Sequence, residues 1–212
     1  MTCRTVTALC VALSASSAAP SWANLVSNGG FETQNLDQNN NPIPPPPDWE
    51  ITGDGIVIDT AFPNTGTYDM SFGAASNDPN PGILSQSIAT VPGQSYDLSF
   101  ALLDQSGLPT NSFVVTFGGF SATITGGQAA SYTTEAFDVP GTDITGSSTT
   151  LSFSGANDTS AWNLDDVFVS ATAIPEPSTG LLVGISVVMG LSFAGRSGRA
   201  CGVFRPRRHG DG

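Results

Sequence analysis

The sequence predicts an all-β fold, an antiparallel β-sandwich that spans residues 24–173. Apolar and polar residues alternate along Tyr96–Leu102, and this period of two is typical of a strand with one buried face. No window between residues 24 and 173 shows the 3.6-residue apolar period of an amphipathic helix. Turn-forming pairs such as Pro92-Gly93, Gly118-Gly119 and Pro140-Gly141 separate the apolar runs, which is the pattern of a sandwich.

We expect about eight to ten strands from the spacing of these turns. The runs with strand character are Ile56–Asp59, Gly82–Ile88, Tyr96–Leu102, Ser112–Phe117, Phe120–Thr125, Tyr132–Val139, Leu151–Ser154 and Trp162–Val169. Their pattern predicts that Phe31, Phe100, Phe117 and Phe153 lie in the core. This length of chain can bury one core without disulfides.

The segment Asn39–Pro47 contains five prolines. Proline has no backbone N–H to give to a sheet, so the sequence predicts an extended loop that leads into Trp49. A motif that docks a partner protein is the alternative.

The predicted domain is strongly acidic. Sixteen of the 18 acidic residues lie between 24 and 173, and all six arginines lie outside this range, so the formal charge of the domain is −16. Nucleic acids and anionic membrane surfaces are therefore excluded as its partners, because both require cationic side chains. Self-repulsion at this charge destabilises the compact state unless cations, such as a divalent metal, neutralise part of it.

The predicted domain also lacks cysteine and histidine, which occur only at Cys3, Cys10, Cys201 and His209. Disulfides, Ser-His-Asp and Cys-His catalysis, and zinc sites built on these residues are thereby excluded. We assign no catalytic residue and expect no enzyme. A pair of carboxylates acting as in glycosidases is the remaining alternative, and the domain has only the glutamates Glu32, Glu50 and Glu135.

Residues 1–23 are typical of a secretory signal peptide. Arg4 supplies the positive start, Val6–Ser17 is apolar and small, and Ser21-Trp22-Ala23 fits the small-x-small cleavage pattern. We expect the mature protein to be exported and to begin near Asn24.

A second targeting segment follows the domain. The triplet Pro175-Glu176-Pro177 precedes an apolar run, which predicts a single transmembrane helix over about residues 179–195. Arginines at 196, 199, 205, 207 and 208 would keep the end of the chain in the cytoplasm. Residues 174–208 thereby resemble the PEP-CTERM sorting signal of Gram-negative bacterial surface proteins, with 209–212 as a short tail. The alternative is an ordinary C-terminal anchor.

The PEP-CTERM resemblance implies a partner and a destination. In that family exosortase, a membrane-embedded transpeptidase, reads the signal and delivers the protein to the cell surface or its exopolysaccharide matrix. The chain would then be anchored in the inner membrane at least transiently.

Two stretches frame the domain, Asn28–Glu32 (NGGFE) and Trp162–Val167 (WNLDDV). They resemble the opening and closing signatures of the galactose-binding-like jelly-roll superfamily, which includes many carbohydrate-binding modules. The resemblance implies that the first and last strands are neighbours and that Glu32 and Asp166 bind a structural calcium ion. Solvated carboxylates are the alternative. A β-bulge near Asp165-Asp166 is expected, because Trp162 and Leu164 otherwise face away from Val167 and Val169.

Sugar binding would need exposed aromatic side chains. Trp49, Phe62, Tyr68 and Tyr132 lie near turns and are the candidates for ligand binding. The alternative is that they only cap the edges of the sandwich. We therefore expect a non-enzymatic protein of the cell surface or extracellular matrix that binds carbohydrate, or else a purely structural or adhesive envelope protein.

Overall fold

The computed structural model describes residues 23–127 and 131–172. Residues 1–22 of the predicted signal peptide, and the predicted sorting motif and transmembrane helix after Thr172, lie outside the described residues. Within the described ranges, no helix is long and apolar enough to cross a membrane.

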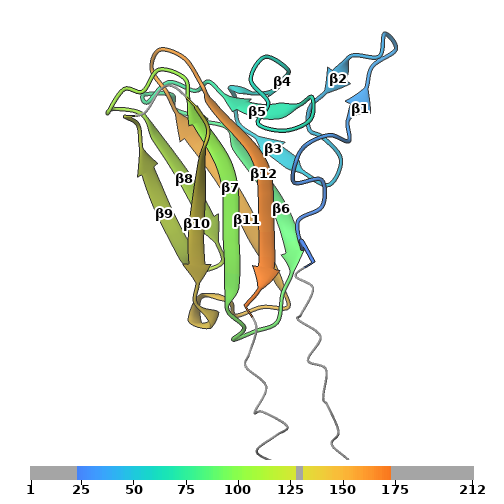
Figure 1. Ribbon diagram of the computed structural model, residues 1–212, viewed down its shortest axis with the longest axis vertical. Coiled ribbons are helices and arrows are strands. Elements are labelled where there is room, and N and C mark those ends of the chain that lie inside the picture. Colours follow the sequence, from blue (N-terminus) through green and yellow to red (C-terminus); the bar gives the residue numbers. More distant parts are fainter. Residues whose placement is uncertain (1–22, 128–130, 173–212) are drawn as a thin grey trace, which may run out of the picture. The chain divides into compact units, whose positions relative to one another are not determined.

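Two five-stranded antiparallel sheets pack face to face (Figure 1). The first has the order β10 (Thr133–Val139), β7 (Tyr96–Asp104), β12 (Trp162–Ala171), β5 (Asp69–Phe72) and β4 (Ile56–Asp59). The second has the order β3 (Glu50–Thr52), β6 (Ile83–Ala89), β11 (Ser148–Ala156), β8 (Ser112–Phe117) and β9 (Phe120–Thr125). One 3₁₀ turn, Gly141–Asp143, is the single helical element of the described residues. The all-β sandwich prediction is confirmed.

The proline-rich segment is not entirely the extended loop that the sequence predicts. Pro42–Ile43 forms strand β2, which pairs with β1 (Asn35–Leu36) in a small separate sheet. The turn between them is held by Asp37, whose Oδ1 accepts hydrogen bonds from the backbone N–H groups of Asn39 and Asn41. A ladder of only two residue pairs, with no further strand beside it, tolerates a proline that cannot donate.

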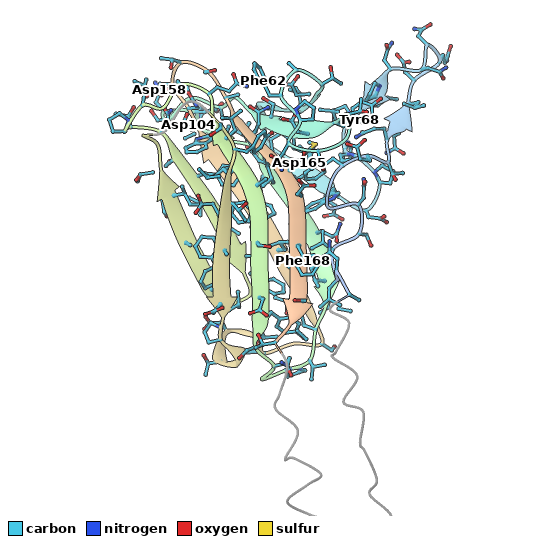
Figure 2. The ribbon with its side chains drawn as sticks, in the orientation of Figure 1. Phe62, Tyr68, Asp104, Asp158, Asp165 and Phe168 are labelled. Atoms are coloured by element: carbon cyan, nitrogen blue, oxygen red, sulfur yellow. The ribbon has the colours of Figure 1, made fainter. Side chains whose placement is uncertain are left out.

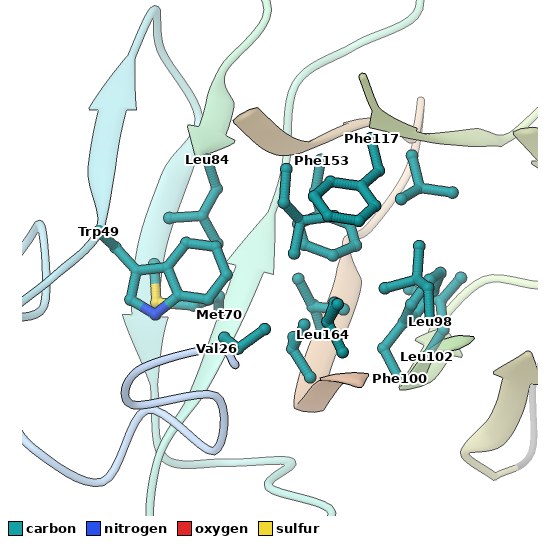
Figure 3. Close-up of a cluster of buried hydrophobic side chains, with 14 of the residues drawn as sticks. Val26, Trp49, Met70, Leu84, Leu98, Phe100, Leu102, Phe117, Phe153 and Leu164 are labelled. Carbon is teal, nitrogen blue, oxygen red and sulfur yellow. The ribbon is translucent and has the colours of Figure 1, made fainter. Parts of the chain in front are cut away.

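The core lies between the two sheets. Phe31, Phe100, Phe117 and Phe153 are at most 1% exposed, as predicted. Trp49 belongs to the same cluster (Figure 3). Its ring packs 5.4 Å from that of Phe31. Edge-to-face and tilted aromatic pairs run through this cluster, which is the favourable arrangement for aromatic rings.

The N-terminal stretch lies along β12. The backbone N–H of Leu25 donates to the Val169 carbonyl, and the N–H of Val167 donates to the Gly29 carbonyl. Asn24 adds a side-chain bridge, because its Nδ2 donates to the Val167 carbonyl and its Oδ1 accepts from the Val169 N–H. The two framing stretches of the sequence are thus neighbours.

Candidate functional site

Strand β12 contains the predicted β-bulge. Its register against β7 shifts between Asp165 and Phe168, and Asp166 has a φ of 50°. The shift returns Val167 and Val169 to the core side, which Trp162 and Leu164 also occupy, and all four are at most 2% exposed. Asp165 and Phe168, which lie along the same strand in Figure 2, are left on the outer face of the sheet.

Asp165 anchors the loop that joins β4 to β5. Its Oδ2 accepts the backbone N–H groups of Asn64 (2.9 Å) and Thr65 (3.0 Å), and its Oδ1 accepts that of Asp166 (2.7 Å). Burial raises the pKa of the Asp165 carboxyl to about 6, although these hydrogen bonds act in the opposite direction. The carboxyl therefore titrates close to neutral pH.

Asp69 and Tyr132 form a second buried network beside this loop. Oδ2 of the fully buried Asp69 accepts hydrogen bonds from the Tyr132 hydroxyl (2.7 Å) and from Asn163 Nδ2 (2.8 Å). The same hydroxyl lies 2.6 Å from the Phe62 carbonyl oxygen, yet it has only one hydrogen to donate. Burial raises the pKa of Asp69. Once protonated, Asp69 can donate to Tyr132, whose hydrogen is then available to Phe62.

The predicted calcium ligands contact the same loop. Glu32 Oε1 accepts the backbone N–H groups of Thr67 and Tyr68. Asp166 accepts hydrogen bonds from Asn64 Nδ2 (2.7 Å) and the Thr65 hydroxyl (2.6 Å). Both Asp166 oxygens and one Glu32 oxygen thus have protein donors. Among the described residues no three acidic, cysteine or histidine side chains come together as a metal site. Calcium at Glu32 and Asp166 stays a prediction.

An open groove crosses the outer face of the first sheet. Ser99 of β7 pairs with Ala136 of β10 on one side and with Phe168 of β12 on the other. In the next row, Asp97 pairs in the same way with Asp138 and Ser170. These side chains line a shallow groove of about 520 Å³, in which Phe168 is the outward-facing aromatic residue and is half-buried.

Two carboxylates lie side by side in this groove. Asp97 and Asp138 are directly opposite on neighbouring strands, a placement in which like charges repel. The Thr172 hydroxyl donates to Asp97 Oδ1 at 3.3 Å, and Asp138 is exposed. Ligand groups that donate hydrogen bonds would relieve this repulsion.

The aromatic residues predicted for sugar binding lie elsewhere. The prediction for Trp49 is wrong, because its side chain is 3% exposed and its Nε1–H donates to the Asn28 carbonyl inside the core. Tyr132 is half-buried, with its hydroxyl in the Asp69 network. Tyr68 is half-buried at the end of the β4–β5 loop, and Phe62 is 47% exposed on that loop. None of the four lines the groove around Phe168.

Sequence reasoning missed Phe168, although a signal for it was present. The predicted bulge puts Val167 and Val169 on the core side, so the residue between them must face outward. Asp97 and Asp138 were counted only as part of the net charge, because nothing in the sequence pairs their strands.

No protein-family model matches the chain, and no curated protein matches it. Solved structures do resemble it. The module TmCBM61 in complex with beta-1,4-galactotriose is 17% identical, with a TM-score of 0.49 over 71% of this chain and 99% of that one. The CBM22-1 xylan-binding domain of Paenibacillus barcinonensis Xyn10C is 16% identical, with a TM-score of 0.46 over 74% and 99%.

The enzymatically active domain of tailspike protein 4 of bacteriophage CBA120 is also similar. It is 12% identical, with a TM-score of 0.51 over 70% of this chain and 21% of that one. At this identity the similarity concerns the fold alone. It shows that the β-sandwich architecture of this chain also occurs in a solved protein.

Proposed function

We propose that this protein is a non-enzymatic, exported envelope protein whose sandwich binds neutral glycan chains in the groove around Phe168. One observation carries the proposal: an outward aromatic ring lies in an open groove beside two opposed carboxylates, Asp97 and Asp138. The groove is open to solvent on the face of the sheet, so it can receive part of a longer chain.

The chemistry of the groove matches that of a sugar. The face of a pyranose ring presents C–H groups, which pack on an aromatic ring such as Phe168. Its hydroxyl groups donate hydrogen bonds, and ionised carboxylates accept such bonds more strongly than neutral acceptors do. The half-buried Ser99 adds a hydroxyl that can both donate and accept.

The charge of the domain limits the class of glycan. The described residues contain no lysine, arginine or histidine, so no cationic side chain faces an anionic polysaccharide there. Repulsion from Asp97 and Asp138 would add to this effect at low salt. Uncharged polysaccharides are therefore favoured over uronic acid polymers.

Replacing Phe168 with alanine is expected to weaken glycan binding by about tenfold or more, the effect of losing an interaction of about 1.4 kcal/mol. The full chain would be run by affinity electrophoresis in gels that contain β-1,4-galactan, xylan or mannan, with alginate as the anionic comparison. Phe62→Ala is the matched control, because this exposed ring lies outside the groove. If the protein is retarded by no neutral polysaccharide, the glycan proposal is wrong and a purely structural or adhesive role remains.

We also propose that Pro175-Glu176-Pro177 directs sorting of the PEP-CTERM type, through exosortase, to the cell surface or exopolysaccharide matrix. The support is the order of triplet, apolar run and arginines in the sequence. The apolar run would serve as an inner-membrane anchor until processing.

Substituting Glu176 with alanine is expected to trap the unprocessed chain in the inner membrane of its native host. The measurement is the intact mass of the protein recovered from the envelope. The wild-type mass should correspond to a chain that begins near Asn24 and ends within the triplet region, with or without an added group. A wild-type mass that includes Arg205–Arg208 would identify an ordinary anchor instead.

A further inference from the structure

A buried carboxylate at the far end of β7 has no role in the groove described above. Asp104 continues the inward-facing series of Tyr96–Leu102 and is 4% exposed (Figure 2). Its Oδ1 accepts hydrogen bonds from Asn111 Nδ2 (2.9 Å), Asn157 Nδ2 (3.1 Å) and the Ser106 N–H (3.2 Å). Its Oδ2 is buried and accepts none from the described residues.

A second buried oxygen without a hydrogen-bond donor lies on Asn111, beside Asp104. Asn111 is 1% exposed, and its Oδ1 also lacks a hydrogen-bond partner among the described residues. Burying such groups without a partner costs about 1–3 kcal/mol each, and more for a charged group, so native proteins rarely leave them unpaired. Both unsatisfied atoms are acceptors, so the missing partner must carry positive charge or donate hydrogen bonds.

Gly126 packs closely against Asp104. A Cβ atom on Gly126 would lie 2.1 Å from the Leu108 carbonyl oxygen and 2.4 Å from Asp104 Oδ2, so these two oxygens are near neighbours. A groove of about 230 Å³ leads to this point, and Asp104, Gly126, Glu135 and Trp162 are among its lining residues. The groove is a route for a small ion from solvent, and Glu135 brings a second carboxylate to its wall.

We propose that Asp104, Asn111 and the Leu108 carbonyl hold a calcium ion, with Glu135 attracting it from the groove. Calcium takes six to eight oxygen ligands at about 2.3–2.6 Å, and it accepts carboxylate, amide, carbonyl and water oxygens together. The described chain has no cationic side chain that could neutralise Asp104 instead. With one buried carboxylate, the site should bind weakly, in the range of about 10⁻⁴–10⁻³ M that is typical of extracellular modules.

This location differs from the calcium predicted at Glu32 and Asp166. There, both oxygens of Asp166 and Oε1 of Glu32 already have protein donors. At the Asp104 site, by contrast, Asp104 Oδ2 and Asn111 Oδ1 have no hydrogen-bond donor among the described residues. Neutralising Asp104 should therefore weaken calcium binding, whereas neutralising Glu32 or Asp166 should not affect binding at the Asp104 site.

The test is calorimetric titration of the purified full chain with CaCl₂, together with its melting temperature in calcium and in EDTA. Asp104→Asn should weaken calcium binding at least tenfold at this site and remove the calcium-dependent rise in melting temperature. The variant should still fold, because the new amide group at the Oδ2 position can donate to the Leu108 carbonyl. Glu135→Gln, on the groove wall, should weaken binding severalfold.

Glu32→Gln and Asp166→Asn are the matched controls, and both should bind calcium at the Asp104 site with the affinity of the wild type. The proposal is overturned if Asp104→Asn binds calcium like the wild type, whether or not the control variants lose binding. It is also overturned if the wild type takes up no calcium at millimolar concentration, which would mean that water fills the space. TbCl₃ provides a second readout, because Trp162 lines the groove and can sensitise terbium emission.

Discussion

Replacing Trp49 with alanine is expected to lower the free energy of unfolding by about 3–5 kcal/mol, the usual cost of removing a large buried aromatic side chain. The indole packs 5.4 Å from the Phe31 ring and 6.3 Å from the Phe153 ring, and its Nε1–H donates to the Asn28 carbonyl at 3.1 Å. Deletion leaves a cavity between these rings and removes one of the two hydrogen bonds that the Asn28 carbonyl accepts, the other coming from the Phe31 N–H. Urea denaturation of the full chain, followed by circular dichroism, measures the loss.

Two further variants separate a core role from a surface role. Trp49→Phe keeps an aromatic ring but loses the hydrogen bond, so its cost should be smaller than that of alanine. Phe62→Ala removes an aromatic ring that is 47% exposed, and it should change stability by no more than about 0.5 kcal/mol. If Trp49→Ala kept full stability and lost glycan binding, Trp49 would be a sugar platform after all.

The stability of the protein is expected to fall as pH rises from about 4 to about 6, because the buried Asp165 holds its proton to a higher pH than it does in the unfolded chain. Its pKa is raised to about 6 in the folded state from an ordinary value of 3.8. Below pH 4 both states are protonated, and the stabilisation is complete. Between pH 4 and 6 only the folded state keeps the proton, so stability is lost progressively. The expected total is at most about 3 kcal/mol, from a shift of about two pKa units at about 1.4 kcal/mol each, and smaller to the extent that solvent screens the carboxylate.

The raised pKa of Asp69 contributes in the same direction, through the network with Tyr132. Urea midpoints at several pH values between 4 and 7 would measure the combined slope. The Asp165→Asn variant has no carboxyl to titrate at this position. Its urea midpoint should therefore depend less steeply on pH, by the amount that Asp165 contributes in the wild type. Asp54→Asn removes the same formal charge from an exposed position and should leave the slope nearly unchanged. Equal slopes in the wild type and in Asp165→Asn would contradict the assignment.

Much of the fold could be predicted from the sequence because it depends on local patterns. The period of two along β7 and β12 identifies strands and their buried faces before any pairing is known. The apolar residues Trp162, Leu164, Val167 and Val169 break this alternation by one residue, which predicted a bulge. The register shift of β12 against β7 confirms it. Strand β3 was missed because three residues are too few to show a period.

The burial of individual polar and aromatic side chains was decided by tertiary structure. Asp165 is buried because the N–H groups of residues about one hundred positions earlier cover it, and no local pattern encodes that contact. Trp49 follows a proline-rich segment without periodicity, so its turn-like surroundings suggested exposure, whereas the packing of Phe31 and Phe153 encloses it. The groove at Phe168 likewise exists only because β10, β7 and β12 are neighbours in the sheet. Composition and periodicity thus determined an acidic β-sandwich. The long-range pairing of its strands decided which carboxylates are buried and which aromatic ring faces solvent, because desolvation depends on neighbours that are distant in the sequence.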